Sequence, residues 1–218
     1  MKSHARTLFA AAFGLLTLPL FAAGHPDTTG WKDLFAPDLS NAMSPGKWTM
    51  KNGVLVAGDH ETLWTRKSYG DFILDLEFKV EKESNSGVFL RSSNPKNVLA
   101  ALEIQVHGST DGTPHGMCGA LYDCVSPSKD VEKPVGEWNH YTITCKGPLV
   151  TVVFNGVEVI HVNLDDWKEP HKGPDGSHNK FAKALKDFAR SGPIGLQGLH
   201  GQAQSPVYYR NLKIKPLD

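Results

Sequence analysis

Polar and apolar residues alternate with a period of two along much of the chain after residue 48. In residues 72–80, FILDLEFKV, one face carries the apolar set Phe72, Leu74, Leu76, Phe78 and Val80, and the other carries Ile73, Asp75, Glu77 and Lys79. Residues 102–107 show the same alternation, with Leu102, Ile104 and Val106 on one face and Glu103, Gln105 and His107 on the other. Period two is typical of β-strands with one buried face. The pattern therefore predicts a protein built from strands.

Turn signals separate these segments. Asn52-Gly53 and Asn155-Gly156 are dipeptides that favour tight hairpins. Helical spacing occurs in residues 179–190, where an apolar stripe is formed by Phe181, Ala184, Leu185 and Phe188. Many short antiparallel strands with one minor helix predict an all-β fold. We expect a two-sheet antiparallel jelly-roll sandwich with one short helix.

The N-terminus has the pattern of an export signal. A basic start, MKSHAR, precedes the apolar run TLFAAAFGLLTLPLF, and small residues follow up to Gly24. The apolar run is short for a transmembrane anchor. We expect a signal peptide over residues 1–24 and a single β-sandwich domain over residues 25–218. The mature protein would then be periplasmic or extracellular, with no membrane span.

Charge narrows the choice of partner. Lys plus Arg and Asp plus Glu both number 23, so the formal net charge is zero. Phosphate recognition needs a basic excess. We therefore expect no nucleic-acid partner. Small molecules of little charge remain candidate ligands.

The three cysteines have no zinc-finger spacing. In an exported chain a disulfide between Cys118 and Cys124 could close a short loop, and Cys145 would then be unpaired. Cys145 lies in a strand pattern, YTITC, where a small buried apolar side chain is its expected role.

The stretch SNSGVFLRSS, residues 84–93, raises the question of function. With period two, Gly87, Phe89 and Arg91 share one face of this strand. Glu103, Gln105 and His107 likewise share one face of their strand. Their fork-shaped and titratable groups suit vicinal hydroxyls, which both donate and accept hydrogen bonds. Aromatic residues such as Phe89 and Tyr122 suit the apolar face of a pyranose ring. The alternative is an ordinary solvated sheet face.

Short motifs in a fixed order carry a family resemblance. They are GWKDLF, WTMKNGVLVA, LWTRKSYGDFILDLEFKV, NSGVFLR, LEIQV, CGALYD, KPVGEWNHYTI, VFNGVEV, GPIGLQGLHG and VYYRNLKI. Together they resemble the 3-keto-disaccharide hydrolase family, long catalogued as a domain of unknown function, with a concanavalin A-like lectin/glucanase fold. The chain departs from the pattern in one place. His107 and Gly108 stand where many relatives carry an Asp soon after the E-x-Q motif, which argues against acid chemistry there.

The resemblance implies an exported enzyme that cleaves 3-keto-glycosides, including 3-keto-disaccharides. A ketone at carbon 3 acidifies the proton on carbon 2. A base removes this proton, the glycosidic bond leaves by elimination, and water adds back. The reaction needs a base whose pKa is near neutral and a group that holds the enolate oxygen. The paired carboxylates of ordinary glycosidases are not needed.

Candidate site residues follow from the polar strand faces and the matched motifs. The candidates for the base are Glu103, His107 and His115. The expected substrate contacts are Arg91, which would hold the keto or enolate oxygen, and Gln105, Phe89, Tyr122, Asp123, Gln197 and His200. No cofactor is firmly implied, but a divalent metal ion held by Glu103, His107 and His115 could act as a Lewis acid. We expect these residues to converge in one cleft.

Two other functions stay open at this point. The same polar face would serve a non-catalytic, lectin-like carbohydrate-binding module, and a β-sandwich can also be an interaction protein of the cell envelope. The fold hosts both lectins and hydrolases, so it does not choose between them. The titratable residues favour the enzyme, because a lectin needs amides and aromatic rings more than bases.

Overall fold

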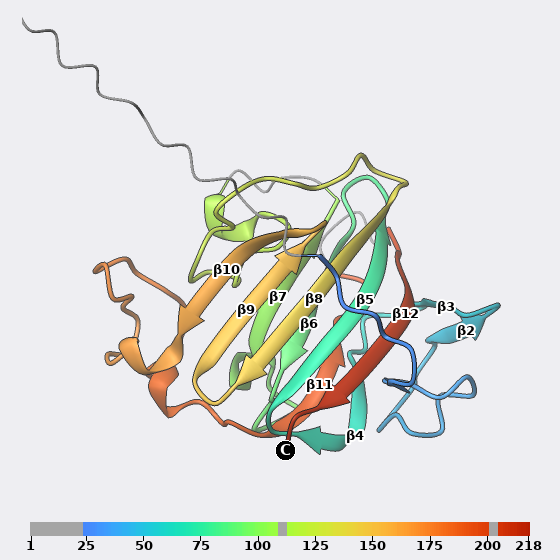
Figure 1. Ribbon diagram of the computed structural model, residues 1–218, viewed down its shortest axis with the longest axis horizontal. Helices are drawn as coiled ribbons and strands as arrows, with labels where there is room; N and C mark the ends of the chain where they lie inside the picture. Colours follow the sequence, from blue (N-terminus) through green and yellow to red (C-terminus); the bar gives the residue numbers. More distant parts are fainter. Residues whose placement is uncertain (1–23, 109–112, 201–204) are drawn as a thin grey trace, which may run out of the picture.

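The computed structural model describes residues 24–108, 113–200 and 205–218. The predicted signal peptide, residues 1–24, lies outside this range apart from Gly24. Two antiparallel β-sheets pack face to face, with the larger sheet in front in Figure 1. The predicted two-sheet sandwich is therefore confirmed.

The larger sheet has eight strands. Their order is β10-β9-β8-β5-β12-β3-β2, and β1 also pairs with β12. In chain order they are β1 (Lys32–Asp33), β2 (Thr49–Lys51), β3 (Val54–Val56), β5 (Phe72–Val80), β8 (Trp138–Lys146), β9 (Leu149–Phe154), β10 (Val157–Asn163) and β12 (Val207–Pro216).

The smaller sheet lies behind the larger one in Figure 1. Its four strands follow the order β4 (Leu63–Tyr69), β11 (Gly192–Leu196), β6 (Asn85–Leu90) and β7 (Leu102–His107). Helical structure in the described ranges consists of single 3-10 turns, which are η1 (Val98–Ala100), η2 (Pro114–Gly116), η3 (Leu164–Asp166) and η4 (Leu185–Asp187).

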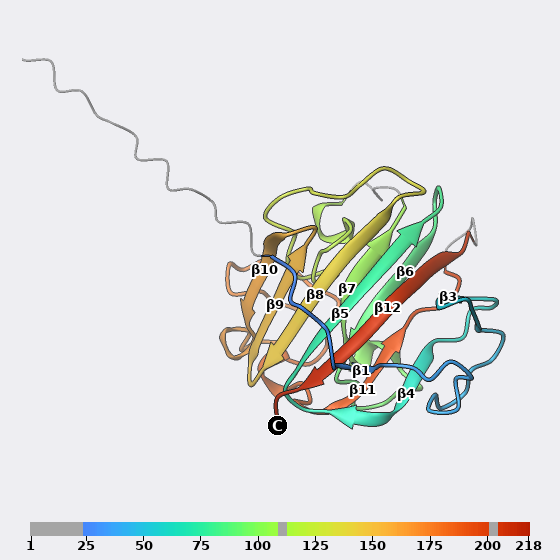
Figure 2. The ribbon, with the colours of Figure 1, turned by 45° about the vertical axis from the view of Figure 1, so that its right-hand side comes forward.

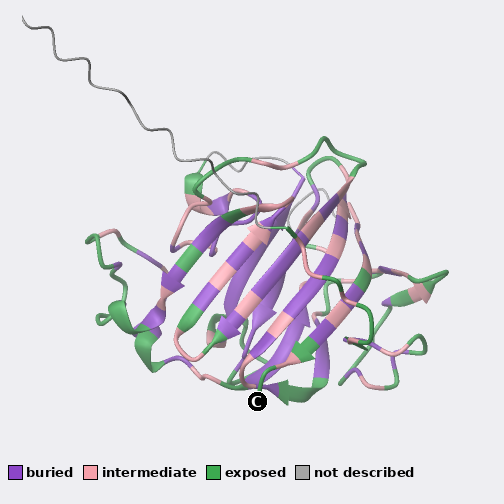
Figure 3. Cartoon of the chain, viewed as in Figure 1, coloured by how far each residue is buried: buried purple, intermediate pink, exposed green. Residues whose placement is uncertain are grey.

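The hydrophobic core lies between the two sheets. The apolar faces that alternation predicted are buried there, namely Phe72, Leu74, Leu76, Phe78 and Val80 of β5 and Leu102, Ile104 and Val106 of β7 (Figure 3). Full burial of one such side chain stabilises the fold by roughly 1.5–3 kcal/mol. The predicted Asn-Gly turns are confirmed between β2 and β3 and between β9 and β10.

The helix predicted over residues 179–190 is wrong. Only η4 forms there, although the apolar stripe is buried as expected. An isolated helix of this length is marginal in water. The backbone groups of this segment bond to other loops instead of forming helical hydrogen bonds. The Lys180 N–H donates to Asp123 Oδ2 (2.5 Å), and the Phe181 carbonyl accepts from the His171 N–H (2.8 Å).

Arg91 does not continue the outer face of β6, as the alternation predicted. The strand ends at Leu90, and Arg91 takes a left-handed backbone conformation with φ 48°. Its buried guanidinium donates to the carbonyls of Gly70 and Gly147, both at 2.7 Å, and to Asp71 Oδ1 at 2.9 Å. Arg91 therefore fastens the smaller sheet to the turns at the end of the larger one.

The cysteines are free thiols. Cys118 and Cys124 are buried and not joined, so the suggested disulfide between them is wrong. Cys118 Sγ lies 3.3 Å from the Tyr141 hydroxyl. Cys145 is buried in β8, as predicted. Among the described residues, no helix has the length and apolar character needed to cross a membrane.

Candidate active site

The polar row of β7 lies on the outer face of the smaller sheet. Register pairs Glu103 with Phe89 and Gln105 with Gly87, so this face points away from the core between the sheets. Glu103, Gln105 and His107 are nevertheless only 6%, 2% and 8% exposed. Because a solvated sheet face would expose such groups, this is a covered polar site.

The loop after β7 provides part of the cover. It runs along the free edge of the strand, where the Gln105 N–H donates to the Ala120 carbonyl (3.0 Å) and the Tyr122 N–H donates to the Glu103 carbonyl (2.9 Å). These bonds bring Tyr122 and Asp123 beside Glu103. Glu103, Tyr122 and Asp123 therefore lie close together, and their role as site residues stays a prediction.

Glycine on the β6 face makes room for the carboxylate. A Cβ on Gly87 would overlap Glu103 Oε1, so a larger residue would push the carboxyl group away. Likewise, a Cβ on Gly195 of β11 would overlap the ring of Trp64. This ring stacks on that of Phe89, with centroids 5.5 Å apart. Phe89 lies opposite Glu103 in the register and is 1% exposed. Because its ring is covered, its predicted role as an open sugar platform is wrong.

Lys180 faces Glu103 from the loop between β10 and β11. Its Nζ lies 3.8 Å from Glu103 Oε2 and 4.1 Å from the centroid of the Tyr122 ring. Asp123 fixes this position through the backbone N–H of Lys180. Lys180 also lines a cavity of about 330 Å³ together with Ser93, Asn97, Leu99, Lys183 and Phe188. This volume lies in the range of small-molecule sites.

The electrostatics of Glu103 suit a base. Burial raises the pKa of the Glu103 carboxyl to about 7, and the charge of Lys180 opposes part of the rise. A carboxyl group in water titrates near 4, so Glu103 becomes both a stronger base and a group that exchanges its proton near neutral pH. The neighbouring ammonium is a donor for developing negative charge.

Two amide oxygens lie unused near this carboxyl. Within the described residues, Gln105 Oε1 and Gln197 Oε1 are buried without a hydrogen-bond partner. Gln105 lies on the same strand face as Glu103, and the Gln197 N–H donates to the Gly87 carbonyl at 2.9 Å. Buried acceptors normally have donors, and hydroxyl groups of a ligand would supply them.

Other predicted site residues are not assembled with Glu103. Arg91 is engaged at the sheet end, as described above. His115 is half-buried on η2, and His200 is exposed beyond β11, where the neighbouring Leu199 N–H donates to the Asp59 carbonyl. His107 ends β7 opposite Asn85 and is buried. The predicted cleft is therefore wrong in part, because it lacks Arg91.

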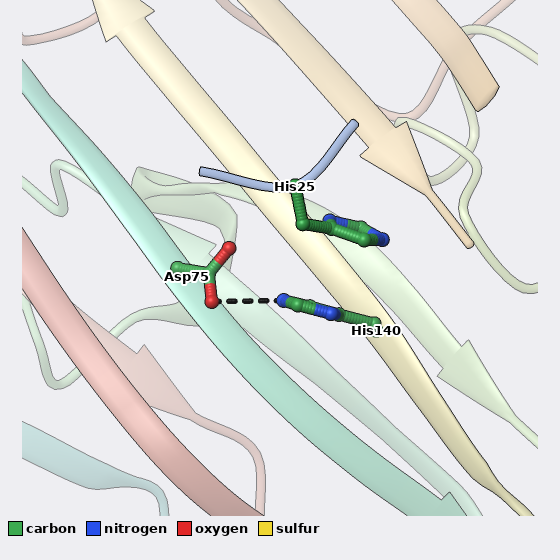
Figure 4. A group of neighbouring side chains, drawn as sticks. All are labelled: His25, Asp75 and His140. Atoms are coloured by element: carbon green, nitrogen blue, oxygen red, sulfur yellow. Dashed lines mark hydrogen bonds and ion pairs between the residues drawn. The ribbon is translucent and has the colours of Figure 1, made fainter. Parts of the chain in front are cut away.

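The proposed metal ligands Glu103, His107 and His115 do not form a compact set. Among the described residues, ligand atoms of three such side chains lie within 4.8 Å of one another only in the group His25, Asp75 and His140. That group lies on the outer face of the larger sheet (Figure 4). It is already hydrogen-bonded internally, His140 Nε2 to Asp75 Oδ1 at 2.8 Å.

Comparison with known proteins defines the class. A solved structure from Parabacteroides distasonis, which carries the provisional name glycosyl hydrolase, superposes with a TM-score of 0.81 at 36% identity, over 86% of this chain and 99% of that one. Another from the same organism, also provisionally a glycosyl hydrolase, gives a TM-score of 0.64 at 25% identity, over 86% and 84%. The fold and these relatives place the chain among glycosyl hydrolase-like, carbohydrate-active β-sandwich proteins.

The family can be named as well. A family model, the 3-keto-alpha-glucoside-1,2-lyase-like domain, matches residues 19–215, and the chain belongs to this family. A 3-keto-disaccharide hydrolase of Bacteroides thetaiotaomicron is 26% identical over 256 residues, which cover 99% of this chain and 86% of that protein. The family resemblance seen in the sequence motifs is confirmed.

Proposed function

We propose that this protein is an exported enzyme that cleaves 3-keto-glycosides by elimination and hydration. One observation carries the proposal, namely a buried carboxyl group with a pKa near 7 beside the Lys180 ammonium, and Lys180 lines a cavity. Family membership supports the substrate class, since the relative from B. thetaiotaomicron is named for 3-keto-disaccharides. The N-terminal sequence pattern supports export.

The reaction assigns a step to each group. The Glu103 carboxylate takes the proton from carbon 2, and the electron pair of the C–H bond moves to form an enolate whose oxygen, on carbon 3, faces the Lys180 ammonium. The enolate then collapses to the ketone with a double bond between carbons 1 and 2, and the glycosidic oxygen leaves carbon 1. The Glu103 carboxylic acid returns its proton to this leaving oxygen. Water adds across the double bond, which gives the 3-keto sugar.

The chemistry matches the charges in the site. A base of pKa about 7 is half ionised at neutral pH, which suits proton removal from a carbon next to a ketone. The donor for the enolate is in place before the reaction, so no reorganisation is needed as charge develops. The unpartnered oxygens of Gln105 and Gln197 accept from sugar hydroxyls.

A lectin-like binding module is the second candidate. The buried amide oxygens favour it, because sugar recognition without catalysis needs such groups. A binding module does not account for the raised pKa of Glu103, because sugar binding does not require a base that titrates at neutral pH.

The experiment compares a 3-keto-glucoside with its unoxidised parent. We expect release of the aglycone from the oxidised substrate and none from the parent, because only the ketone acidifies the proton on carbon 2. Product formation by chromatography measures both. Equal cleavage of the two would indicate acetal hydrolysis by carboxylates. Binding of the oxidised substrate without turnover, with or without added divalent metal, would establish the lectin.

A further inference from the structure

The first described residues cross the outer face of the larger sheet. Residues 24–31, here called the strap, run over β8, β5 and β12 before β1 pairs with β12 (Figure 2). Near the start of the strap, the ring of His25 stacks on that of His140 in β8, with centroids 3.4 Å apart and planes 10° apart (Figure 4). This contact and the bonds of His25 hold the beginning of the strap on the sheet.

The hydrogen bonds of His25 fix its protonation state. The Gly156 N–H donates to His25 Nε2 at 3.0 Å, so Nε2 carries no proton. The single proton of the neutral ring is then on Nδ1, which lies 2.9 Å from Thr142 Oγ1. The Thr142 hydroxyl in turn donates to Asp75 Oδ2 at 2.6 Å. The chain of donors and acceptors is complete only with a neutral His25.

Protonation is incompatible with this arrangement. A proton on Nε2 would face the Gly156 N–H, so two donors would meet and a bond would be lost. The titratable groups around His25 are His140 and Lys133, which disfavour a cation on His25, and Asp75 and Glu77, which favour one. Burial, followed by His140, lowers the pKa of His25 from 6.5 to about 4. The net effect keeps the ring neutral at pH 7.

The same bonds argue against a metal centre at this group. Both nitrogens of His25 are already used, and two parallel rings direct their in-plane lone pairs side by side instead of toward one point. The arrangement is that of a hydrogen-bonded latch.

We propose that His25 is a proton-operated latch that holds the strap on the larger sheet at neutral pH and releases it in acid. The proposal is independent of the chemistry assigned to Glu103, which lies on the other sheet. Release uncovers Asp75, His140 and Thr142, while the pairing of β1 with β12 keeps the far end of the strap attached.

The direction of the pH effect follows from the lowered pKa. The folded state prefers neutral His25, so the latch is fully stabilising above pH 6.5 and weakens as pH falls toward 4. A shift of this size corresponds to an increase in opening on the order of 100-fold across that range, since each pKa unit is a factor of ten.

Nuclear magnetic resonance on the purified chain tests the latch. The two readouts are the ring titration of His25 and the protection of the Gly156 amide against hydrogen exchange, corrected for intrinsic exchange. We expect His25 to titrate near pH 4 and Gly156 protection to fall on the order of 100-fold between pH 6.5 and 4. The amide of Ile143, in the middle of β8, should keep its protection, which separates latch opening from unfolding.

Variants isolate the sensor. In His25→Ala, which has no acceptor for the Gly156 N–H, Gly156 should be unprotected already at pH 7 and show no transition. Asp75→Asn should keep a transition but move it to lower pH, because His25 senses the proton and the Asp75 carboxylate favours the His25 cation. His161→Gln is the matched control, since His161 is 63% exposed on the same sheet, and it should change nothing. Titration of His25 near 6.5, or constant Gly156 protection while His25 titrates, would overturn the proposal.

Discussion

Replacing Glu103 by glutamine should slow turnover of a 3-keto-glucoside by on the order of 100- to 10,000-fold, the usual contribution of a positioned general base. Glutamine keeps the size and the hydrogen-bonding shape of the side chain but has no basic oxygen. Substrate binding should survive within a few-fold, because the amide still packs over Gly87. Steady-state kinetics and calorimetric titration of the substrate measure the two effects separately.

Glu132→Gln is the matched control. Burial, followed by the charge of Asp130, also raises the pKa of Glu132 to about 7, but this residue lies in the loop before β8 and is not among the residues that line the cavity. Its replacement should leave kcat and KM unchanged. Full activity of Glu103→Gln, or an equal loss in both variants, would remove Glu103 from the role of base.

Replacing Lys180 by methionine should reduce kcat by on the order of 100- to 1,000-fold, the loss typical of one donor to a developing oxyanion. Methionine keeps much of the length of the side chain and loses the charge. The variant has a second signature. Lys180 lowers the pKa of Glu103, so its removal should raise that pKa above 7 and move the acid limb of the pH–rate profile to higher pH. A purely structural role for Lys180 would not produce this shift.

Lys183→Met provides the comparison, because Lys183 lines the same cavity and makes no ion pair with Glu103 among the described contacts. Its pH–rate profile should match that of the unaltered protein. An unchanged acid limb in Lys180→Met would show that Lys180 does not act on Glu103, whatever the loss of rate.

Alternation of side chains predicted the parts of the fold that depend on burial. The strands β5 and β7 follow from period two, and the outward position of Glu103 follows with them, because a strand with one buried face leaves its other residues outside. The Asn-Gly turns were equally visible, since few other dipeptides accept the positive φ found at Asn52 and Asn155.

Contacts between distant segments were not predictable in this way. The place of Lys180 beside Glu103 could not be predicted, because the spacing of the nearby buried residues is helical, namely Phe181, Ala184, Leu185 and Phe188. In the structure Asp123 accepts from the Lys180 N–H, and the segment is a loop. Arg91 stands one residue beyond the end of β6, and alternation does not show where a strand stops. His25 meets β8 through side chains alone, which leaves no local pattern in either segment.

Reaction in deuterium oxide tests the central claim most directly. Elimination removes the proton from carbon 2, and the hydration step that follows places a solvent deuteron there. We therefore predict that the 3-keto sugar formed early in the reaction carries deuterium at carbon 2, in excess of the exchange seen without enzyme or with Glu103→Gln. Mass spectrometry and proton magnetic resonance of the product measure the label. A product that keeps its original hydrogen at carbon 2 while the glycosidic bond is cleaved at the full rate would contradict the mechanism.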